Sequence, residues 1–288
     1  MNFEQYLQGK DLSKATIKQY AKEVQRYRIF LRKRGKTPQR AVKKDILDYL
    51  NNKNRPIAKY KKTTIKELTN RTKQQILGTL NHLYNHLSQE QGIQNITQFI
   101  KIRGVKRKYL HDLFNAEELE GLCDVLYYQT HKQKEPGLLA QSNYILLTLI
   151  VYQALNTHEV NRLTKDSFDL RKATVTIEKT KRTNGRTLSL EAAQIGILLN
   201  YFNENETANF ITSRGYIDAL HKQLRKLHPK YNNFAQLRAS IITHWIKIYG
   251  LRKAQYMAGH RYISSTENYL HNDFESLQND LNNFHPLN

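Results

Sequence analysis

The segment AQLRASIITHWIKIYGLRKAQYMAGHRYISSTENY, residues 235–269, carries the most informative spacing in this chain of 288 residues. It contains Arg238, then the pair Gly259-His260, then Tyr269 nine residues after the histidine. Taken singly, each has an ordinary interpretation: a charge on a helix surface, a solvated or core histidine, and one of 18 tyrosines. Their occurrence together in one segment favours a functional site over these separate interpretations.

Helical and strand-like patterns alternate around this segment. An uncharged run from Pro136 to His158 is interrupted by polar residues, so it predicts a buried core helix near residues 144–155 rather than a membrane span. Further helices are predicted after Asn115, which would cap the first of them, and at 191–203, 215–227, 236–249, 251–258 and 272–283. Three short strands are predicted at 168–170, 173–177 and 187–190, with Asn184-Gly185 as the hairpin turn between the last two.

The N-terminal part is helical and strongly basic. Apolar periodicity predicts a helix from Ser13 to near Gly35, a short helix at 46–50 and a longer one at 76–87. Residues 1–113 hold 26 Lys and Arg against 8 Asp and Glu, whereas residues 114–288 hold 20 against 17. A net +18 in the first part favours a polyanionic partner, and nucleic acid ranks ahead of a membrane surface because no basic amphipathic helix or lipidation motif is evident.

Composition narrows the class of protein further. The 12 Gly and 5 Pro are few for this length, which favours long helices over a sandwich or barrel. A single cysteine, Cys123, excludes an internal disulfide, and the N-terminus lacks the pattern of a signal peptide. We therefore expect a cytoplasmic, nucleoid-associated protein with a basic helical domain at 1–102, a basic linker at 103–113 and a second domain at 114–288.

In three features this sequence resembles the tyrosine recombinase (phage integrase) family. Arg238 ends an element like the family's H-x-L-R, Gly259-His260 matches its later G-H, and Tyr269 has the spacing of its nucleophile. The resemblance covers nearly the whole chain. It implies a mainly α fold with a small three-stranded antiparallel sheet, in which a helical core-binding (SAM-like) domain precedes a mixed α+β catalytic domain.

The resemblance also implies a chemistry. The Tyr269 hydroxyl would attack a scissile DNA phosphate, forming a 3′-phosphotyrosyl bond and freeing a 5′-hydroxyl. Arg238 and His260 would stabilise charge on the non-bridging oxygens, and a hairpin lysine would protonate the departing 5′-oxygen. In the family this lysine lies eight residues before a proline position in the last strand. Ser189 occupies that position here, so the resemblance selects Lys181, with Lys179 as the alternative. Neither a metal nor another cofactor is implied.

Two positions depart from the family pattern. Asn156 stands where the family has its first arginine, and Ala235 stands where H-x-L-R has its histidine. The loss of the arginine would cost roughly 10²–10³ in rate, by analogy with an oxyanion donor, and the loss of the histidine as a general base roughly 10²–10⁴. The candidates to replace the arginine are Arg162, Arg182 and Arg186, and those to replace the histidine are His158 and His244.

The resemblance implies double-stranded DNA with paired inverted half-sites as partner, bound by a dimer that assembles into a tetramer. Candidates for DNA contact are the basic residues Lys33, Arg34, Lys61, Lys62, Arg71, Lys73, Lys106, Arg107 and Lys108. Three functions stay open: a recombinase that integrates, excises, inverts or transposes a mobile element, a DNA-binding accessory or regulatory relative without catalysis, and a relaxing enzyme of the type IB topoisomerase kind.

Overall fold

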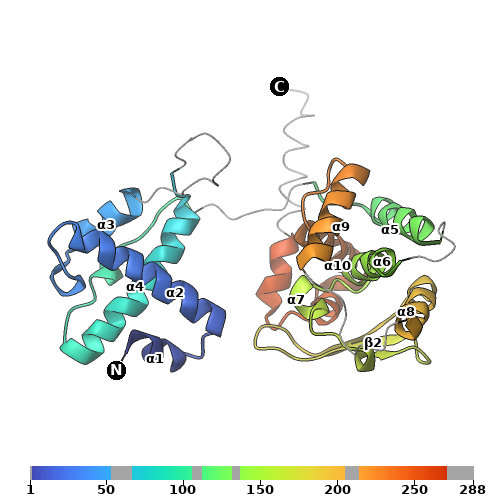
Figure 1. Ribbon diagram of the computed structural model, residues 1–288, viewed down its shortest axis with the longest axis horizontal. Helices are drawn as coiled ribbons and strands as arrows, with labels where there is room; N and C mark the ends of the chain where they lie inside the picture. Colours follow the sequence, from blue (N-terminus) through green and yellow to red (C-terminus); the bar gives the residue numbers. More distant parts are fainter. Residues whose placement is uncertain (1, 53–66, 106–111, 132–136, 205–213, 271–288) are drawn as a thin grey trace, which may run out of the picture. The chain divides into compact units, whose positions relative to one another are not determined.

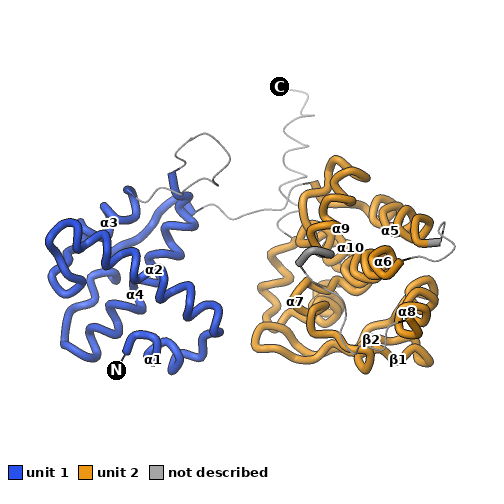
Figure 2. The backbone as a smooth tube through the Cα atoms, in the orientation of Figure 1, with its two compact units in different colours: residues 1–108 blue, residues 109–288 orange. Residues whose placement is uncertain are grey.

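The computed structural model describes residues 2–52, 67–105, 112–131, 137–204 and 214–270. The chain divides into two compact units, residues 1–108 and 109–288 (Figure 2). The division lies within the stretch 103–113 that the sequence suggests as a linker. The predicted helix at 272–283 lies outside the described residues.

Unit 1 is a helical bundle around an apolar core. Its elements are α1 (Phe3–Gln8), α2 (Lys14–Arg32), η1 (Pro38–Arg40), α3 (Lys43–Asn52), α4 (Asn70–Gln91) and η2 (Ile96–Phe99). The Ser13 hydroxyl accepts a hydrogen bond from the Thr16 backbone N–H, so α2 begins as its sequence predicts. Tyr27 and Tyr84 are buried, and their hydroxyls lie 2.9 Å apart, which satisfies both polar groups inside the core.

Unit 2 surrounds one apolar helix, α6 (Leu138–Val151), which is buried from residue 141 to residue 151. In Figure 1, α6 lies among the other helices of the unit, and this confirms the prediction of a core helix. The other helices are α5 (Ala116–His131), α7 (Thr157–Val160), α8 (Ala192–Glu204), α9 (Arg214–Leu227) and α10 (Phe234–Ala258). Over the described ranges, no helix is long and apolar enough to cross a membrane.

The sheet of unit 2 has three antiparallel strands in the order β1-β2-β3, as predicted. The strands are β1 (Phe168–Asp169), which follows η3 (Lys165–Ser167), β2 (Thr174–Ile177) and β3 (Arg186–Ser189). Val175, Ile177 and Leu188 are buried, while the residues between them are more exposed, so one face of the sheet packs on the core.

The prediction of a hairpin turn at Asn184-Gly185 is wrong. The β2–β3 connection turns at residues 180–183, where the Thr180 hydroxyl accepts hydrogen bonds from the backbone N–H groups of Arg182 and Thr183. Asn184 instead donates its backbone N–H to the carbonyl of Gly259, at 2.9 Å. A local turn preference is overridden here because the returning arm of the hairpin pairs with a turn far along the chain.

The segment at 235–269 forms most of α10, which is interrupted at Gly250, then a turn and a further helix. Within α10, Gly250 has φ 77° and ψ 168°, so the backbone leaves the helical conformation where two separate helices are predicted. Gly259 ends α10 in the left-handed conformation, and the chain is helical again from residue 263 to residue 270. Arg238, His260 and Tyr269 therefore lie on a helix, at a turn and on a second helix.

The burial of α6 predicts a large difference between two leucine variants. Leu147 is fully buried in α6, whereas Leu199 in α8 is 47% exposed. We expect Leu147→Ala to lower the free energy of unfolding by about 2–5 kcal/mol, because it leaves a cavity in the core. Leu199→Ala should change it by no more than about 0.5 kcal/mol. Urea unfolding of the full chain measures both, and equal effects would contradict the described core.

Candidate active site

Arg238 lies on the first part of α10 and is almost buried. Its Nη2 donates to the backbone carbonyl of Ala258 at 2.7 Å and lies 3.5 Å from Nε2 of His260. Its Nη1 lies 3.5 Å from Oε2 of Glu159. The guanidinium is therefore held between the carboxylate of α7 and the turn that follows α10.

Glu159 is buried and binds a second arginine more closely. Arg186, at the start of β3, donates from Nη1 to Oε1 at 2.8 Å and from Nη2 to Oε2 at 3.2 Å. Its Nε donates to the backbone carbonyl of Met257 at 2.8 Å. The side chains of Arg186 and Glu159 are 0% and 2% exposed. One buried carboxylate thus joins two arginines that are far apart in the sequence.

The turn around His260 is fixed by the β2–β3 hairpin. Thr183 forms an antiparallel bridge with His260, next to the Asn184–Gly259 hydrogen bond. Gly259 has φ +68°, and a Cβ at this position would overlap the guanidinium of Arg186. Glycine is required here both by the backbone conformation and by the closeness of Arg186.

His260 and Tyr269 stack on one another. Their ring centroids are 5.8 Å apart, and the planes differ by 5°. Thr266 lies one helical turn before Tyr269 on the 263–270 helix, and its Oγ1 is 2.9 Å from Nδ1 of His260. Residues i and i+3 share a helix face, so both side chains meet the imidazole, which explains the nine-residue spacing in structural terms.

The charges around His260 keep its imidazole neutral. Burial, together with the positive charges of Arg238 and Arg186, lowers the pKa of His260 to about 4, and the carboxylate of Glu159 opposes this only in part. An arginine has no acceptor, so the Nε2 that faces Arg238 accepts, and the proton of the imidazole lies on Nδ1 and is donated to Thr266.

The same two arginines keep Glu159 ionised. Burial raises the pKa of this carboxyl, but the hydrogen bonds and charge of Arg186 and the charge of Arg238 outweigh burial and lower it below its usual value. Burial lowers the pKa of Arg238, and the negative charge of Glu159, together with any negative charge on the nearby Tyr269 oxygen, opposes this. The nucleophile candidate and the cation candidate therefore belong to one electrostatic site.

Asn156 and Ala235, the two positions that depart from the family pattern, have different local roles. Asn156 is the N-cap of α7: its Oδ1 accepts from the backbone N–H of Glu159 at 2.9 Å, and its own N–H donates to Glu159 Oε2 at 3.1 Å. This capping box fixes the start of the helix that presents the carboxylate. Ala235 is exposed in the first turn of α10 and offers no functional group.

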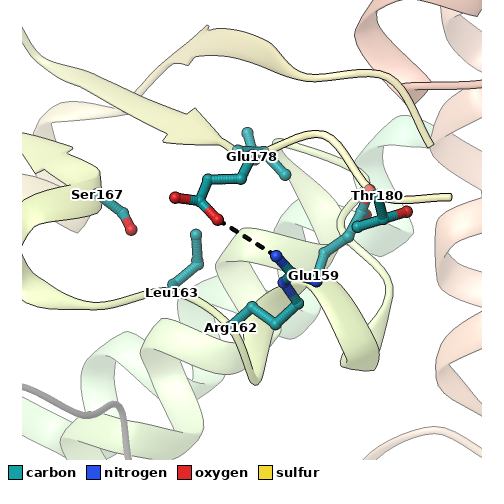
Figure 3. A pocket seen from close by; sticks show the side chains of 7 residues that line it. Glu159, Arg162, Leu163, Ser167, Glu178 and Thr180 are labelled. Carbon is teal, nitrogen blue, oxygen red and sulfur yellow. Dashed lines mark hydrogen bonds and ion pairs between the residues drawn. The ribbon is translucent and has the colours of Figure 1, made fainter.

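The three candidate replacement arginines lie in different surroundings. Arg162 pairs with Glu178 at 3.2 Å, at the edge of a small pocket that Glu159 also lines (Figure 3). Arg182 is exposed in the hairpin turn. Only Arg186 of the three has a hydrogen bond to Glu159 among the described contacts, and its side chain is enclosed.

The predicted lysine lies at the hairpin tip. The backbone carbonyl of Lys181 accepts a hydrogen bond from Nη1 of Arg261 at 3.1 Å, and Arg261 follows His260 directly. The tip is thus tied to the segment that carries the histidine. Lys179, the alternative, lies before the turn and is exposed.

The four basic candidates for DNA contact that the structure describes in unit 1 lie at or next to helix ends. Lys33 is the C-cap of α2, Arg34 pairs with Asp48, and Lys73 donates to Asn51. Arg71 lies in the first turn of α4. Lys61, Lys62, Lys106, Arg107 and Lys108 lie outside the described residues. Within the described ranges, no three His, Cys, Asp or Glu side chains are close enough to hold a metal ion.

Sequence reasoning did not single out two residues of the site, Glu159 and Thr266. The N-x-x-E spacing from Asn156 to Glu159 signals a capping box and could have placed the glutamate at a helix start. For Thr266, the signal is its position three residues before Tyr269 on a helix. Neither signal shows that these side chains meet Arg238 and His260, because that depends on tertiary contacts.

Two glycines with positive φ provide a matched test of the Arg186 packing. Gly92, the C-cap of α4, has φ 66° and ψ 15°, the same left-handed conformation as Gly259, and among the described atoms none lies within 4 Å of the position that its Cβ would take. We expect Gly92→Ala to cost about 1–2 kcal/mol of stability from the backbone alone. Gly259→Ala should cost about 1–3 kcal/mol more, because its methyl must displace a guanidinium. Equal losses in urea unfolding would show that Arg186 does not fill this space.

The lowered pKa of His260 makes a second prediction. In an NMR titration, the imidazole of His260 should still be neutral at pH 6. Its chemical shift should change near pH 4, not near the ordinary pKa of 6.5. The unfolded chain takes up this proton at the higher pH, so stability should fall as the pH drops from 6.5 to 4. His260→Asn should weaken that loss, and a midpoint near 6.5 would contradict the described surroundings.

Comparison with solved structures finds integrases and a site-specific recombinase of similar fold. No family model matches the chain, and no curated protein sequence matches it. The Tn1549 transposon integrase, in complex with transposon right end DNA, is 14% identical with a TM-score of 0.63, covering 93% of this chain and 94% of that one. A lambda integrase dimer bound to a COC′ core site is 15% identical with a TM-score of 0.62, covering 93% and 74%.

A third solved structure, the XerH site-specific recombinase bound to palindromic difH substrate, is 17% identical with a TM-score of 0.59 and covers 81% of this chain and 67% of that one. Identities of this size show the fold. The chain therefore has the fold of the tyrosine recombinases and integrases, in which a helical core-binding part precedes a mixed α+β catalytic part.

Proposed function

We propose that this protein is a site-specific DNA recombinase that cuts and rejoins strands of a mobile element through a 3′-phosphotyrosyl intermediate. The observation that carries the proposal is the stack of Tyr269 on His260 beside Arg238, within the fold of known recombinases. A phenol, a neutral imidazole and a guanidinium in contact are the groups that attack and stabilise a phosphodiester without a metal.

In the proposed cleavage step, the Tyr269 oxygen forms a bond to the scissile phosphorus and the bond to the 5′-oxygen breaks. The phenol proton goes to water, because Ala235 supplies no base. Arg238 donates N–H bonds to a non-bridging oxygen, where charge develops. Lys181, at the hairpin tip, gives a proton to the departing 5′-oxygen. The rejoining step reverses each of these transfers.

Thr266 lets His260 serve a phosphate without losing its support. With Nε2 facing the Arg238 guanidinium, which can only donate, a neutral imidazole carries its proton on Nδ1. A hydroxyl both donates and accepts, so Thr266 can instead donate to Nδ1 while Nε2–H donates to a phosphate oxygen. One hydrogen bond thus supports both tautomers of a neutral histidine, and the low pKa favours this neutral form.

The partner in this proposal is double-stranded DNA with paired inverted half-sites, bound by a dimer that forms a tetramer when two sites meet. The net +18 of residues 1–113 supports DNA as the partner. In addition, the structurally similar integrases and XerH were determined with DNA. Integration, excision, inversion and transposition all use this chemistry.

A second candidate function is a DNA-binding accessory or regulatory relative that no longer cleaves. Asn156 and Ala235 favour it, because two groups expected at the phosphate are absent. Against it, the hydrogen bonds of Arg238, His260 and Thr266 form a connected arrangement that DNA binding alone does not require.

Removal of one hydroxyl separates the two candidates. We expect the wild-type protein to form a covalent adduct with a nicked suicide substrate taken from the ends of its own element, visible on a denaturing gel. Tyr269→Phe should form none while its DNA affinity stays nearly unchanged, since the aromatic ring remains.

Tyr262→Phe is the matched control, because Tyr262 lies in the same segment and is 63% exposed. It should form adduct like the wild type. An adduct that survives Tyr269→Phe would refute Tyr269 as the nucleophile, and specific binding with no wild-type adduct would favour the accessory function.

A further inference from the structure

Arg186 is a buried charge without exposure to solvent. Its side chain is 0% exposed, and its three nitrogens donate to the two oxygens of Glu159 and to the carbonyl of Met257. An enclosed guanidinium with these partners has no face left for a DNA phosphate. Arg238 is bound less closely: its Nη1 makes one long contact, 3.5 Å, with the same carboxylate.

The distances show how the carboxylate is shared. Glu159 accepts two hydrogen bonds from Arg186, of 2.8 and 3.2 Å, whereas its contact with Arg238 is 3.5 Å long. Breaking a buried ion pair by removing one partner leaves the other charge uncompensated, which the structure relieves by finding a new partner. Without Arg186, the nearest cation to Glu159 is Arg238, and a tighter pair would neutralise the charge that a phosphate needs.

Arg186 also contacts the turn that presents His260. It binds the carbonyl of Met257 and fills the space above Gly259, the two residues that lead into the histidine. The Gly259 carbonyl in turn receives the Asn184 N–H from the hairpin arm, close to β3. One side chain therefore supports both the cation and the imidazole of the site.

We propose that Arg186 is a positioning residue of the DNA cleavage site: it occupies the carboxylate of Glu159 and so leaves Arg238 available to the phosphate, while it holds the Gly259–His260 turn. This inference rests on the proposed function. It differs from a direct replacement of the arginine expected at Asn156, since Arg186 acts through Glu159 and does not touch DNA.

Rescue by a second substitution tests the proposal. The rate of adduct formation on suicide DNA is measured for wild type, Arg186→Met and the double variant Glu159→Gln/Arg186→Met. We expect Arg186→Met to cleave roughly 10- to 100-fold more slowly, by analogy with residues that orient the ligands of a metal site. The double variant should regain at least part of that loss, because no carboxylate remains to capture Arg238.

Lys172→Met is the matched control, because Lys172 pairs with Asp169 on the surface of the same sheet and its loss should not slow cleavage. An Arg186→Met variant that cleaves at the wild-type rate overturns the proposal. A double variant no faster than Arg186→Met also overturns it and indicates a direct or purely structural role. If Arg186→Met does not fold, the double variant decides, since it removes both members of the buried Glu159–Arg186 ion pair and should fold and cleave.

A second readout does not depend on cleavage. His260 is faced by Arg238 of α10, Arg186 of β3, Glu159 of α7, and Thr266 and Tyr269 of the 263–270 helix. Loss of the Arg186 charge should raise the NMR titration midpoint of His260, assigned by its absence in His260→Asn. An unchanged midpoint overturns the positioning role. A raised midpoint in a protein that forms no adduct would refute the proposed function alone.

Discussion

The arrangement of the candidate site depends on the buried carboxylate of Glu159. It accepts two hydrogen bonds from Arg186, lies within 3.5 Å of Arg238, and completes the capping box that begins α7. A buried carboxylate is costly unless cations and N–H groups surround it. Three distant segments, α7, β3 and α10, are therefore held together at one point, and the Gly259–His260 turn is attached to the same point through Met257.

Asn156 contributes to the placement of Glu159, a role that its position in the sequence motif does not reveal. An asparagine is among the best N-caps, so the residue that replaces an expected arginine stabilises the helix that carries Glu159. The positive charge beside this carboxylate comes from β3, through Arg186. In this chain a buried carboxylate thus lies between two arginines, one on α10 and one on β3.

Much of the fold could be predicted from the sequence, because its signals are local. The Ser13 cap, the apolar α6 and the three short strands follow from periodicity and capping residues. The hairpin turn was predicted wrongly at Asn184-Gly185, since contacts with Gly259 decide its path. For the same reason, Arg238, His260 and Tyr269 could be identified by spacing, whereas the enclosure of Arg186 by Glu159 and Met257 needs the tertiary structure.

In the proposed site, Arg238 binds the phosphate while Arg186 remains paired with Glu159. The most direct measurement is a crystal structure of the covalent complex with suicide DNA. The account predicts a phosphotyrosyl bond at Tyr269, the guanidinium of Arg238 on a non-bridging oxygen, and Arg186 still paired with Glu159. A structure in which Arg186 leaves the carboxylate and binds the phosphate, or in which the phosphate lies away from Arg238, would contradict it.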